Sequence, residues 1–314
     1  MFKFILKRVF LIVPLLFGVS IFVFFILRLN GTDAVLSYLT VSGIVPTDET
    51  INEARVHLGL DKPILMQYIL WLKDALMLDF GTSYLTNRDV MGDMIYYLPA
   101  TLKLAGFALF ITLVVSIPVG IICSIYKDSF FDYIIRFFCF LGVCTPNFWL
   151  GLLLVVFFSI KLGILPPFGI GGISHLIMPA FSIAFMSMAI NIRFIRSNML
   201  NIKNERFVYY AKLRGVKMRK IQTNHIFLNA LIPVVTAIGM HIGELVGGAL
   251  IVENIFAYPG VGRYAVSAIS NNDYPVVQCF VLMMSFVFIV INLIIDIVYA
   301  LIDPRIRLGL ESSK

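Results

Sequence analysis

Long apolar runs and short polar segments alternate along this chain. Four of the runs contain no charged residue, a fifth is uncharged but shorter, and a sixth is interrupted by one histidine and one glutamate. In chain order the runs cover Val9–Leu27, Leu104–Tyr126, Phe137–Ile160, Leu176–Ile192, Ile226–Val252 and Pro275–Ile295. A bilayer core needs about 20 residues of helix. We therefore predict six transmembrane helices and an all-α, polytopic membrane fold.

A polar segment of residues 30–98 separates the first two runs and is too long for a simple loop. Thr50–Glu53 has the spacing of a capping box, which predicts that a helix begins there. In Pro63–Leu78, apolar side chains recur on one helical face, and the Gly-containing turn Asp79–Thr82 ends this second helix. The segment is interpreted as a small helical cap outside the membrane, which either takes part in function or only shields the spans.

These patterns divide the chain into three regions. Residues 1–29 form the first transmembrane helix, residues 30–98 form the extracytoplasmic helical cap, and residues 99–314 form a five-helix membrane core. A cytoplasmic loop at residues 197–225 lies within that core. Four prolines fall inside predicted spans, where proline kinks a helix, and static kinks that aid packing are expected at Pro14, Pro118, Pro146 and Pro233.

The composition agrees with a membrane protein. Hydrophobic residues make up 60% of the 314, and the mean hydropathy is +0.93, outside the range of soluble proteins. With the N-terminus in the cytoplasm, 17 Lys and Arg residues fall on the inner side and 8 on the outer side. Because cytoplasmic loops are enriched in Lys and Arg, both termini are predicted to be cytoplasmic. The net charge of +7 is then explained by the basic cytoplasmic segments, and nucleic acid is not an expected partner.

The segment from Arg193 to Lys220 is strongly basic, with nine Lys or Arg residues and one acid, Glu205. Its pattern predicts a short amphipathic helix at Glu205–Leu213, a stop at Gly215 and a second helix. Such a helix pair makes a compact knob that fits a groove on another protein, although a basic loop lying on anionic headgroups is the alternative. No Gly-rich phosphate-binding loop occurs in the sequence, so any ATPase is predicted to be a separate chain.

His241 and Glu244 are ionisable residues inside the fifth span and share one helical face. Such residues cost roughly 2.5–3.5 kcal/mol on insertion scales and usually face the bundle interior or water. Imidazole suits nickel, and a carboxylate can accept the other ring N–H. The pair therefore predicts a transient metal contact, with a structural His–Glu pair as the alternative. A zinc-peptidase site is not indicated, because Leu245 stands where the second histidine would be.

Several stretches together resemble the permease subunits of the dipeptide/oligopeptide/nickel class of bacterial ABC importers. They are LGLDKPILMQY (58–68), LPATLKLA (98–105), TPNFWLG (145–151), LRGVKMRK (213–220), NALIPVVTAIG (229–239), ENIFAYPGVGRYAVSAI (253–269), DYPVVQ (273–278) and DPRIR (303–307). The resemblance covers nearly the whole chain. Within the class, GMHIGELVGG (239–248) resembles the nickel permeases, because peptide permeases generally lack this histidine and glutamate.

The resemblance implies a type I importer fold in the bacterial cytoplasmic (inner) membrane. It implies import of nickel, free or as a small-molecule chelate, with dipeptide or oligopeptide import as the alternative and a membrane-embedded enzyme as a remote one. The implied partners are a second homologous permease subunit, two ATP-binding cassette subunits, an extracytoplasmic solute-binding protein and membrane lipid. ATP and Mg²⁺ belong to the partner subunits, and this chain is expected to bind no cofactor and to catalyse no reaction.

The resemblance also assigns candidate sites. The family's ATPase-coupling signature, Glu-Ala-Ala followed by Gly, falls on Tyr209, Tyr210, Ala211 and Gly215, with Arg214 beside the glycine. The glutamate and the first alanine are absent, so no carboxylate role is implied at position 209. Besides His241 and Glu244, the candidates along the translocation path are Met240, Met186 and Met188, for which packing is the alternative.

The segment between the fifth and sixth spans is the candidate outer gate. Its Pro-Gly and Gly residues predict a re-entrant turn, and its two aromatic residues suit a wet–apolar boundary. The gate candidates are Glu253, Phe256, Tyr258, Pro259, Gly260 and Asp273.

Overall fold

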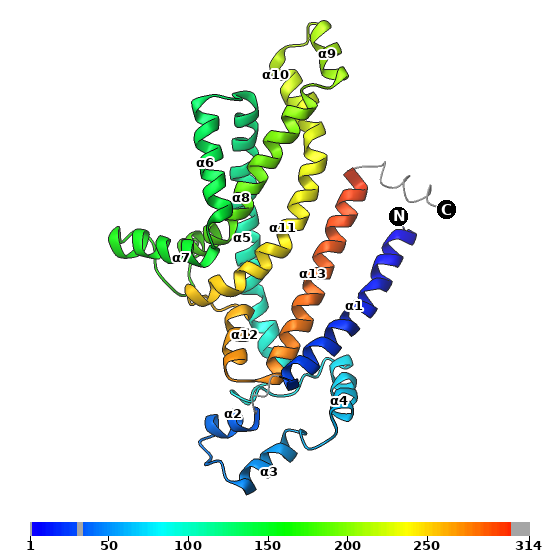
Figure 1. The fold of residues 1–314 in the computed structure, drawn as a ribbon, viewed down its shortest axis with the longest axis vertical. Helices are drawn as coiled ribbons and strands as arrows, with labels where there is room; N and C mark the ends of the chain where they lie inside the picture. Colours follow the sequence, from blue (N-terminus) through cyan, green and yellow to red (C-terminus); the bar gives the residue numbers. More distant parts are fainter. Residues whose placement is uncertain (1, 30–33, 303–314) are drawn as a thin grey trace. The chain divides into compact units, whose positions relative to one another are not determined.

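The computed structural model describes residues 2–29 and 34–302. Within these ranges, the side chains of residues 2–5, 7, 9, 223–224, 231–242, 244 and 298–302 lie outside the described part. Apart from one isolated bridge between Thr82 and Asp89, every regular element in these ranges is a helix (Figure 1). The all-α prediction is therefore confirmed. The helices are α1 (Phe2–Leu29), α2 (Ala34–Val41), α3 (Asp48–His57), α4 (Ile64–Leu76), α5 (Val90–Ile125), α6 (Phe130–Cys144), α7 (Asn147–Leu154), the π-helix η1 (Val155–Lys161), α8 (Ser174–Ile202), α9 (Arg206–Leu213), α10 (Met218–Lys220), the π-helix η2 (Ile221–Phe227), α11 (Leu228–Ile255), α12 (Val261–Ser270) and α13 (Tyr274–Ile302).

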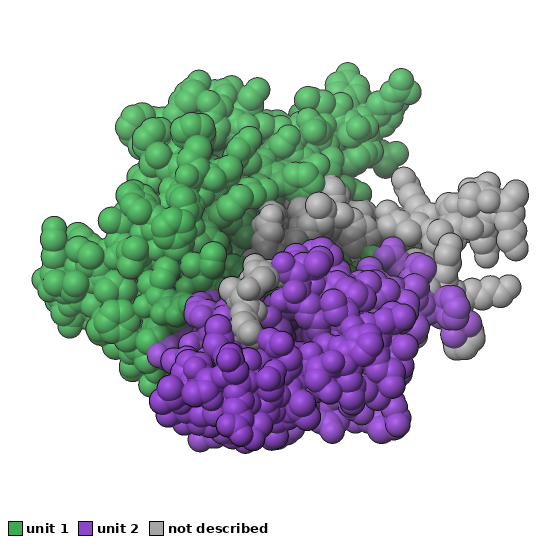
Figure 2. Space-filling view, turned by 60° about the horizontal axis from the view of Figure 1, so that its bottom comes forward, with its two compact units in different colours: residues 1, 102–258, 291–314 green, residues 2–101, 259–290 purple. Residues whose placement is uncertain are grey.

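The chain forms two compact units, coloured separately in Figure 2. Unit 1 holds residues 102–258 and the end of α13 from residue 291, and unit 2 holds residues 2–101 and 259–290. Helix α5 contributes its first turns to unit 2 and the remainder to unit 1, so the predicted cap–core boundary at 98/99 falls inside a continuous helix.

In unit 1, α8 lies between α6 and α11 and packs against both (Figure 1). Small residues allow the close approach to α6: a Cβ added at Gly142 would lie 2.7 Å from the Cβ of Ala189. One side of α8 is buried along most of its length, including Met178, Ile183 and Ile195. Helix α8 is therefore the central helix of this unit.

The predicted span Phe137–Ile160 is not a single helix. It is divided between α6 and the continuous pair α7–η1, whose axes differ by 109°. The break occurs at Thr145, which is extended (φ −92°, ψ 118°) because the ring of Pro146 disfavours the helical conformation of the residue before it. A proline expected to kink this span instead divides it.

Four other helices are long and apolar enough to cross a membrane, and the bent pair makes a possible fifth span among the described residues. These four lie on α1, α5, α8 and α13, as the hydrophobic runs predicted. The remaining predicted span, Ile226–Val252, lies on η2 and α11, and many of its side chains are outside the described part.

In unit 2, the N-cap of α3 lies three residues before Thr50, the N-cap that the sequence pattern predicted. Thr47 is the N-cap: its Oγ1 accepts a hydrogen bond from the Thr50 N–H (3.3 Å), and the Thr47 N–H donates to Thr50 Oγ1 (2.8 Å). Helix α4 begins after Pro63, as predicted. It is fixed to α1 through Ser20 and Tyr68, whose hydroxyl oxygens are 3.0 Å apart.

Candidate coupling region and translocation path

The predicted helical knob at the coupling loop is present in the structure. Glu205 is the extended N-cap of α9, and the left-handed conformation of Gly215 (φ +75°) ends the turn after the helix. The Val216 N–H then donates a 3.2 Å hydrogen bond to the Ala211 carbonyl. Helix α10 follows directly and continues into η2, so the chain re-enters the bundle within a few residues.

Ala211 and Val208 form the buried side of α9. They belong to one apolar cluster that also contains Ile195 and Met199 of α8, Ile221 and Ile226 of η2, and Ala230 of α11. The cluster joins the knob to the ends of two long helices by side-chain packing. Because packed interiors are stiff, α9 cannot shift without displacing the side chains of α8 and α11 that it packs against.

The opposite side of α9 faces solvent. Tyr209 and Tyr210 are 61% and 58% exposed, and Arg214, just beyond the helix, is also exposed. The ring centroids of the two tyrosines lie 6.2 Å apart, in an edge-to-face arrangement. Two exposed aromatic side chains on a short helix give the knob a surface suited to protein–protein contact, because tyrosine combines an apolar ring with a polar hydroxyl. Of the predicted coupling residues, the tyrosines and Arg214 are thus available to a partner, whereas Ala211 is a packing residue.

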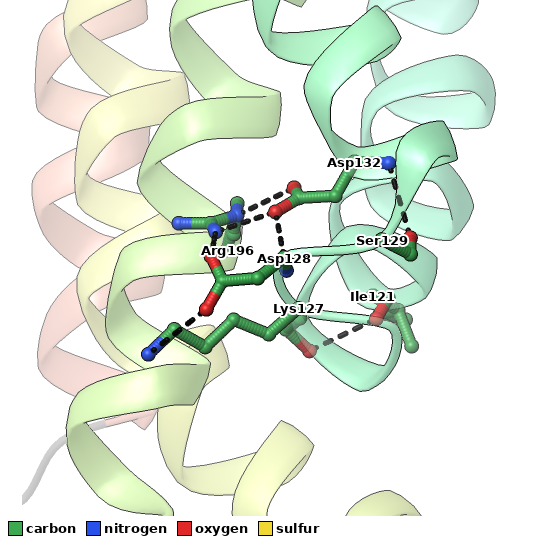
Figure 3. A network of polar contacts seen from close by, with 7 residues as sticks. Ile121, Lys127, Asp128, Ser129, Asp132 and Arg196 are labelled. Carbon is green, nitrogen blue, oxygen red and sulfur yellow. Dashed lines mark hydrogen bonds and ion pairs between the residues drawn. The ribbon is translucent and has the colours of Figure 1, made fainter.

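An ion pair that the sequence reasoning missed lies at the neighbouring end of α8. Arg196 donates from Nε and from one terminal nitrogen to the two carboxylate oxygens of Asp132 on α6, each at 2.7 Å (Figure 3). The Asp132 side chain is fully buried, and that of Arg196 is 15% exposed. Two parallel, charge-assisted hydrogen bonds fix the relative position of α6 and α8 at this point.

The turn between α5 and α6 is tied to the same pair. The Asp128 N–H donates to Asp132 (3.0 Å), and Ser129 caps α6 by accepting from the Asp132 N–H (3.3 Å). The Asp128 carboxylate lies 4.0 Å from a terminal nitrogen of Arg196 and 3.6 Å from Lys127 Nζ. The Asp128 side chain is exposed, whereas that of Asp132 is buried. A signal for this network was available in the sequence, since Asp132 lies in the short polar segment before the third predicted span and Arg196 lies in the basic segment after the fourth.

The candidate gate residues of unit 1 are buried. Glu253, in the last turn of α11, and Phe256 and Tyr258, just after it, are 0%, 2% and 1% exposed. Phe256 contacts Gly151 of α7, where an added Cβ would lie 3.1 Å from its ring. Burial, followed by the nearby Glu253 carboxyl, raises the pKa of Tyr258. This packing differs from the wet–apolar boundary predicted for the aromatic pair, and their gating role stays a prediction.

The other gate candidates, Pro259, Gly260 and Asp273, belong to unit 2. The segment predicted as a re-entrant turn contains the helix α12. Apolar side chains at helical spacing, at Val261, Ala265 and Ala268, form the buried face of this helix. Gly260 is the N-cap of α12. The next N–H, of Val261, donates a 2.9 Å hydrogen bond to Thr101 Oγ1 on α5.

Asp273 is buried before the start of α13. Its carboxylate accepts hydrogen bonds from Ser83 Oγ (2.6 Å) and the Leu85 N–H (3.3 Å), while its Oδ1 has no hydrogen-bond partner within the described part. Burial raises the pKa of this carboxyl above its ordinary value, and the hydrogen bonds oppose that shift.

The candidates along the path are only partly placed. Met188 is buried in α8 at 4% exposure, and Met186 is half-buried two residues earlier. Met240, His241 and Glu244 belong to α11, and their side chains are among those outside the described part. Within the described residues, no group of three His, Cys, Asp or Glu side chains is arranged to hold a metal ion. The metal contact of His241 and Glu244 stays a prediction.

Two family models match the chain. The model "Binding-protein-dependent transport system inner membrane component" covers residues 116–308, and the N-terminal model of the same transport systems covers residues 1–105. The chain belongs to this family. It is therefore a membrane permease subunit of an ABC importer, a class that works with separate ATPase subunits and a substrate-binding protein.

Relatives and solved structures agree with this assignment. The dipeptide transport system permease protein DppB of Alkalihalophilus pseudofirmus is 34% identical over 98% of this chain and 100% of the relative. The metal-staphylopine import system permease protein CntB of Staphylococcus aureus is 35% identical over 98% of this chain and 99% of the relative. Inward-facing MetNI methionine ABC transporter structures match with TM-scores of 0.54 and 0.56 at 14% and 16% identity, covering 68% of this chain and 97% of theirs. The fold is that of a type I importer permease, as predicted.

Proposed function

We propose that this permease imports nickel, either as the free ion or bound to a small organic chelator. The observation that carries the proposal is the spacing of His241 and Glu244, one turn apart on α11. Imidazole is a favourable ligand for nickel, and the carboxylate can hold the second ring nitrogen. Ionisable residues inside a membrane helix usually face the bundle interior or a water-filled cavity, which makes the pair a candidate for contact with cargo. The similarity to a metal-staphylopine permease supports a metal cargo.

The pair is proposed as a passing contact, because a conduit has to release what it binds. Met240 lies beside His241 on the same helix, and Met186 and Met188 lie on α8, which packs against α11. Thioether sulfur prefers softer metals than nickel. These methionines are therefore assigned to the wall of the path and the histidine to the cargo contact.

The proposed cycle uses the two sides of the membrane differently. A solute-binding protein delivers cargo on the extracytoplasmic side, at residues 30–98 and 253–275. On the cytoplasmic side, an ATPase pair grips Tyr209 and Tyr210, and its closure moves α8 and α11 through the cluster beneath α9. A second, homologous permease completes the pathway, and both termini of this chain are cytoplasmic. Nucleotide then biases a two-state change between inward-open and outward-open forms.

ATP-dependent nickel uptake tests the proposal. The chain is purified with the ATPase, permease and binding-protein products of its neighbouring genes and placed in proteoliposomes. His241→Ala and Glu244→Ala should each lower nickel uptake roughly tenfold or more while leaving the ATPase rate intact. His175→Ala is the matched control, since this histidine lies in the first turn of α8, outside α11 and outside the coupling loop. Normal uptake by both variants would assign the pair a structural role and remove the main support for nickel.

Dipeptide or oligopeptide import is the second candidate, favoured by the printed names of several relatives. They include DppB and a putative peptide transport system permease protein of Brucella abortus that is 36% identical over 96% of this chain and 98% of the relative. Calorimetry on the associated solute-binding protein separates the two cargoes. Tight binding of dipeptides without any binding of nickel or nickel chelates would replace the nickel proposal with this one.

A further inference from the structure

A pocket of about 600 Å³ lies between α6 and α8 in unit 1, near the end of α8 that leads into the coupling region. Its lining combines three arginines, three apolar side chains and one hydroxyl. The residues are Arg136 and Phe140 from α6, and Ile190, Arg193, Phe194, Arg196 and Ser197 from α8. Cationic and apolar groups in one pocket favour an amphiphilic, anionic ligand.

The protein neutralises only part of the positive charge of the pocket. Arg196 is engaged by Asp132. Arg136 lies over the ring of Tyr133 at 4.8 Å, and within the described part neither Arg136 nor Arg193 forms an ion pair. Both are exposed and line the pocket. Two arginine side chains are therefore free to bind an anion, and the Asp132–Arg196 pair holds the two walls in place.

The lining of the pocket is apolar as well as charged. Phe140 is 61% exposed and Phe194 is 37% exposed, on helices that belong to predicted membrane spans. In a bilayer such side chains face acyl chains. The arginines fall in the segments 127–136 and 193–220, whose basic residues place them at the cytoplasmic headgroup level by the positive-inside rule.

We propose that this pocket binds an anionic glycerophospholipid of the inner leaflet. Arg136 and Arg193 contact the phosphate, for which guanidinium geometry is well suited. The Ser197 hydroxyl donates a hydrogen bond to it, and Phe140, Ile190 and Phe194 contact the first part of an acyl chain. Basic pockets between membrane helices on the cytoplasmic side are a recognised form of lipid headgroup site. The ligand is chemically distinct from the transported cargo, so this proposal does not depend on the nickel assignment.

The position of the site gives the lipid a defined effect on the protein. The bound phosphate bridges α6 and α8 one turn from the Asp132–Arg196 pair and close to the apolar cluster beneath α9. It therefore adds a second connection between these helices where ATPase motion enters the membrane domain. Anionic lipid should stabilise the permease more than zwitterionic lipid of the same chain length.

Native mass spectrometry of the full-length permease, released from micelles with added lipid, tests the proposal. The probes are phosphatidylglycerol and phosphatidylcholine with identical acyl chains. Phosphatidylglycerol should be retained preferentially, and Arg136→Gln and Arg193→Gln should each weaken its binding roughly fivefold, the effect expected per basic residue near a membrane surface. Arg206→Gln is the matched control, because it removes one exposed positive charge outside the pocket.

Two further measurements distinguish a lipid phosphate from free phosphate and control for variants that fail to fold. Millimolar inorganic phosphate should not displace the lipid, and displacement would assign the pocket to a soluble anion and overturn the proposal. The Arg136→Lys/Arg193→Lys double variant should keep the preference for phosphatidylglycerol even if the glutamine variants unfold. Equal retention of the two lipids by the native protein, or an unchanged preference in the folded glutamine double variant, would also overturn it.

Discussion

Ser83 and Asp273, 190 residues apart in the sequence, are joined by a 2.6 Å hydrogen bond from Ser83 Oγ to the Asp273 carboxylate. Both side chains are buried. The same Ser83 oxygen also accepts hydrogen bonds from the N–H groups of Leu85 (3.2 Å) and Thr86 (3.0 Å). One hydroxyl thus organises the turn before α5 and holds the residue that precedes α13. This contact connects the two chain segments of unit 2.

Replacing Ser83 with alanine should destabilise the protein by about 1–3 kcal/mol, because it leaves a buried carboxylate without one of its donors. The measurement is thermal or denaturant unfolding of the purified permease in one detergent. Ser270→Ala is the control, since this exposed hydroxyl bonds only to the carbonyl four residues earlier on its own helix. Equal stability of the two variants would show that the Ser83–Asp273 contact contributes little.

Asp273 should also give unit 2 a specific pH dependence. Its pKa is raised by burial from the ordinary value of 3.8, so the folded protein binds this proton more strongly than the unfolded chain does. Its contribution to stability is complete below the unfolded pKa and is lost as pH rises through the folded pKa. Asp273→Asn, which mimics the protonated acid, should therefore match the native protein near pH 4 and become the more stable of the two as pH rises towards 7.

Unfolding midpoints of the native protein and Asp273→Asn, measured from pH 4 to pH 8, check this expectation. Tyr84 and Tyr264 lie in the same unit, but burial raises their pKa values and both stay neutral over this range. A native protein that gains stability over the variant with rising pH would mean that the hydrogen bonds outweigh the desolvation of the carboxylate.

The Asp132–Arg196 pair should be costly to break from one side only. Asp132→Ala leaves a largely buried guanidinium without its carboxylate and should cost about 3–5 kcal/mol of unfolding free energy. Asp132→Leu combined with Arg196→Met should cost much less, since no charge is then left unpaired. Asp128→Asn is the matched control and should cost at most about 1 kcal/mol, because this aspartate is exposed and lies 4.0 Å from the arginine, and asparagine also tolerates the left-handed backbone at this position (φ +62°). If the double variant lost as much stability as the Asp132→Leu and Arg196→Met single variants lose together, the two side chains would not be directly coupled.

Local patterns were sufficient to predict most helices of this protein. The uncharged runs predicted α1, α5, α8 and α13 because burial in a bilayer requires continuous apolar sequence, whatever the rest of the chain does. The knob of α9 and Gly215 was equally local, since a glycine in the left-handed conformation ends a helix without help from tertiary contacts.

Features that depend on competing local signals or on distant residues were harder to predict. Thr47 and Thr50 are both plausible caps, and Thr50–Glu53 matched the capping pattern although Thr47 starts α3. Pro146 permits either a kink or a complete break, and apolar composition is the same in both cases. The Asp132–Arg196 pair joins residues 64 positions apart, and helical periodicity does not specify which spans become neighbours.

The exposed tyrosines of α9 should matter for partner binding and little for folding. Tyr209→Ala and Tyr210→Ala are expected to leave the unfolding midpoint unchanged but to reduce copurification of the ATPase subunit and ATP-driven transport, since each removes a large exposed contact surface. Tyr96→Ala is the control, because that tyrosine is 76% exposed but lies on α5 in unit 2. Full ATPase recovery with the double variant Tyr209→Ala/Tyr210→Ala would exclude these residues from docking.

Gly142 should be a strict requirement of the α6–α8 contact. A Cβ at this position would lie 2.7 Å from the Cβ of Ala189, closer than packed carbon atoms approach, and the neighbouring atoms include the backbone carbonyl of Phe185 at 3.5 Å. Gly142→Ala should therefore cost about 1–3 kcal/mol through overpacking, although alanine favours helix formation. Gly106→Ala on α5 is the matched control, since nothing lies within 4 Å of its added Cβ, and this variant should be as stable as the native protein or more so. Ala189→Gly in the Gly142→Ala background should recover part of the loss by removing the opposing methyl group. A Gly142→Ala protein that unfolds at the same temperature as Gly106→Ala would mean that α6 and α8 do not approach this closely in the membrane.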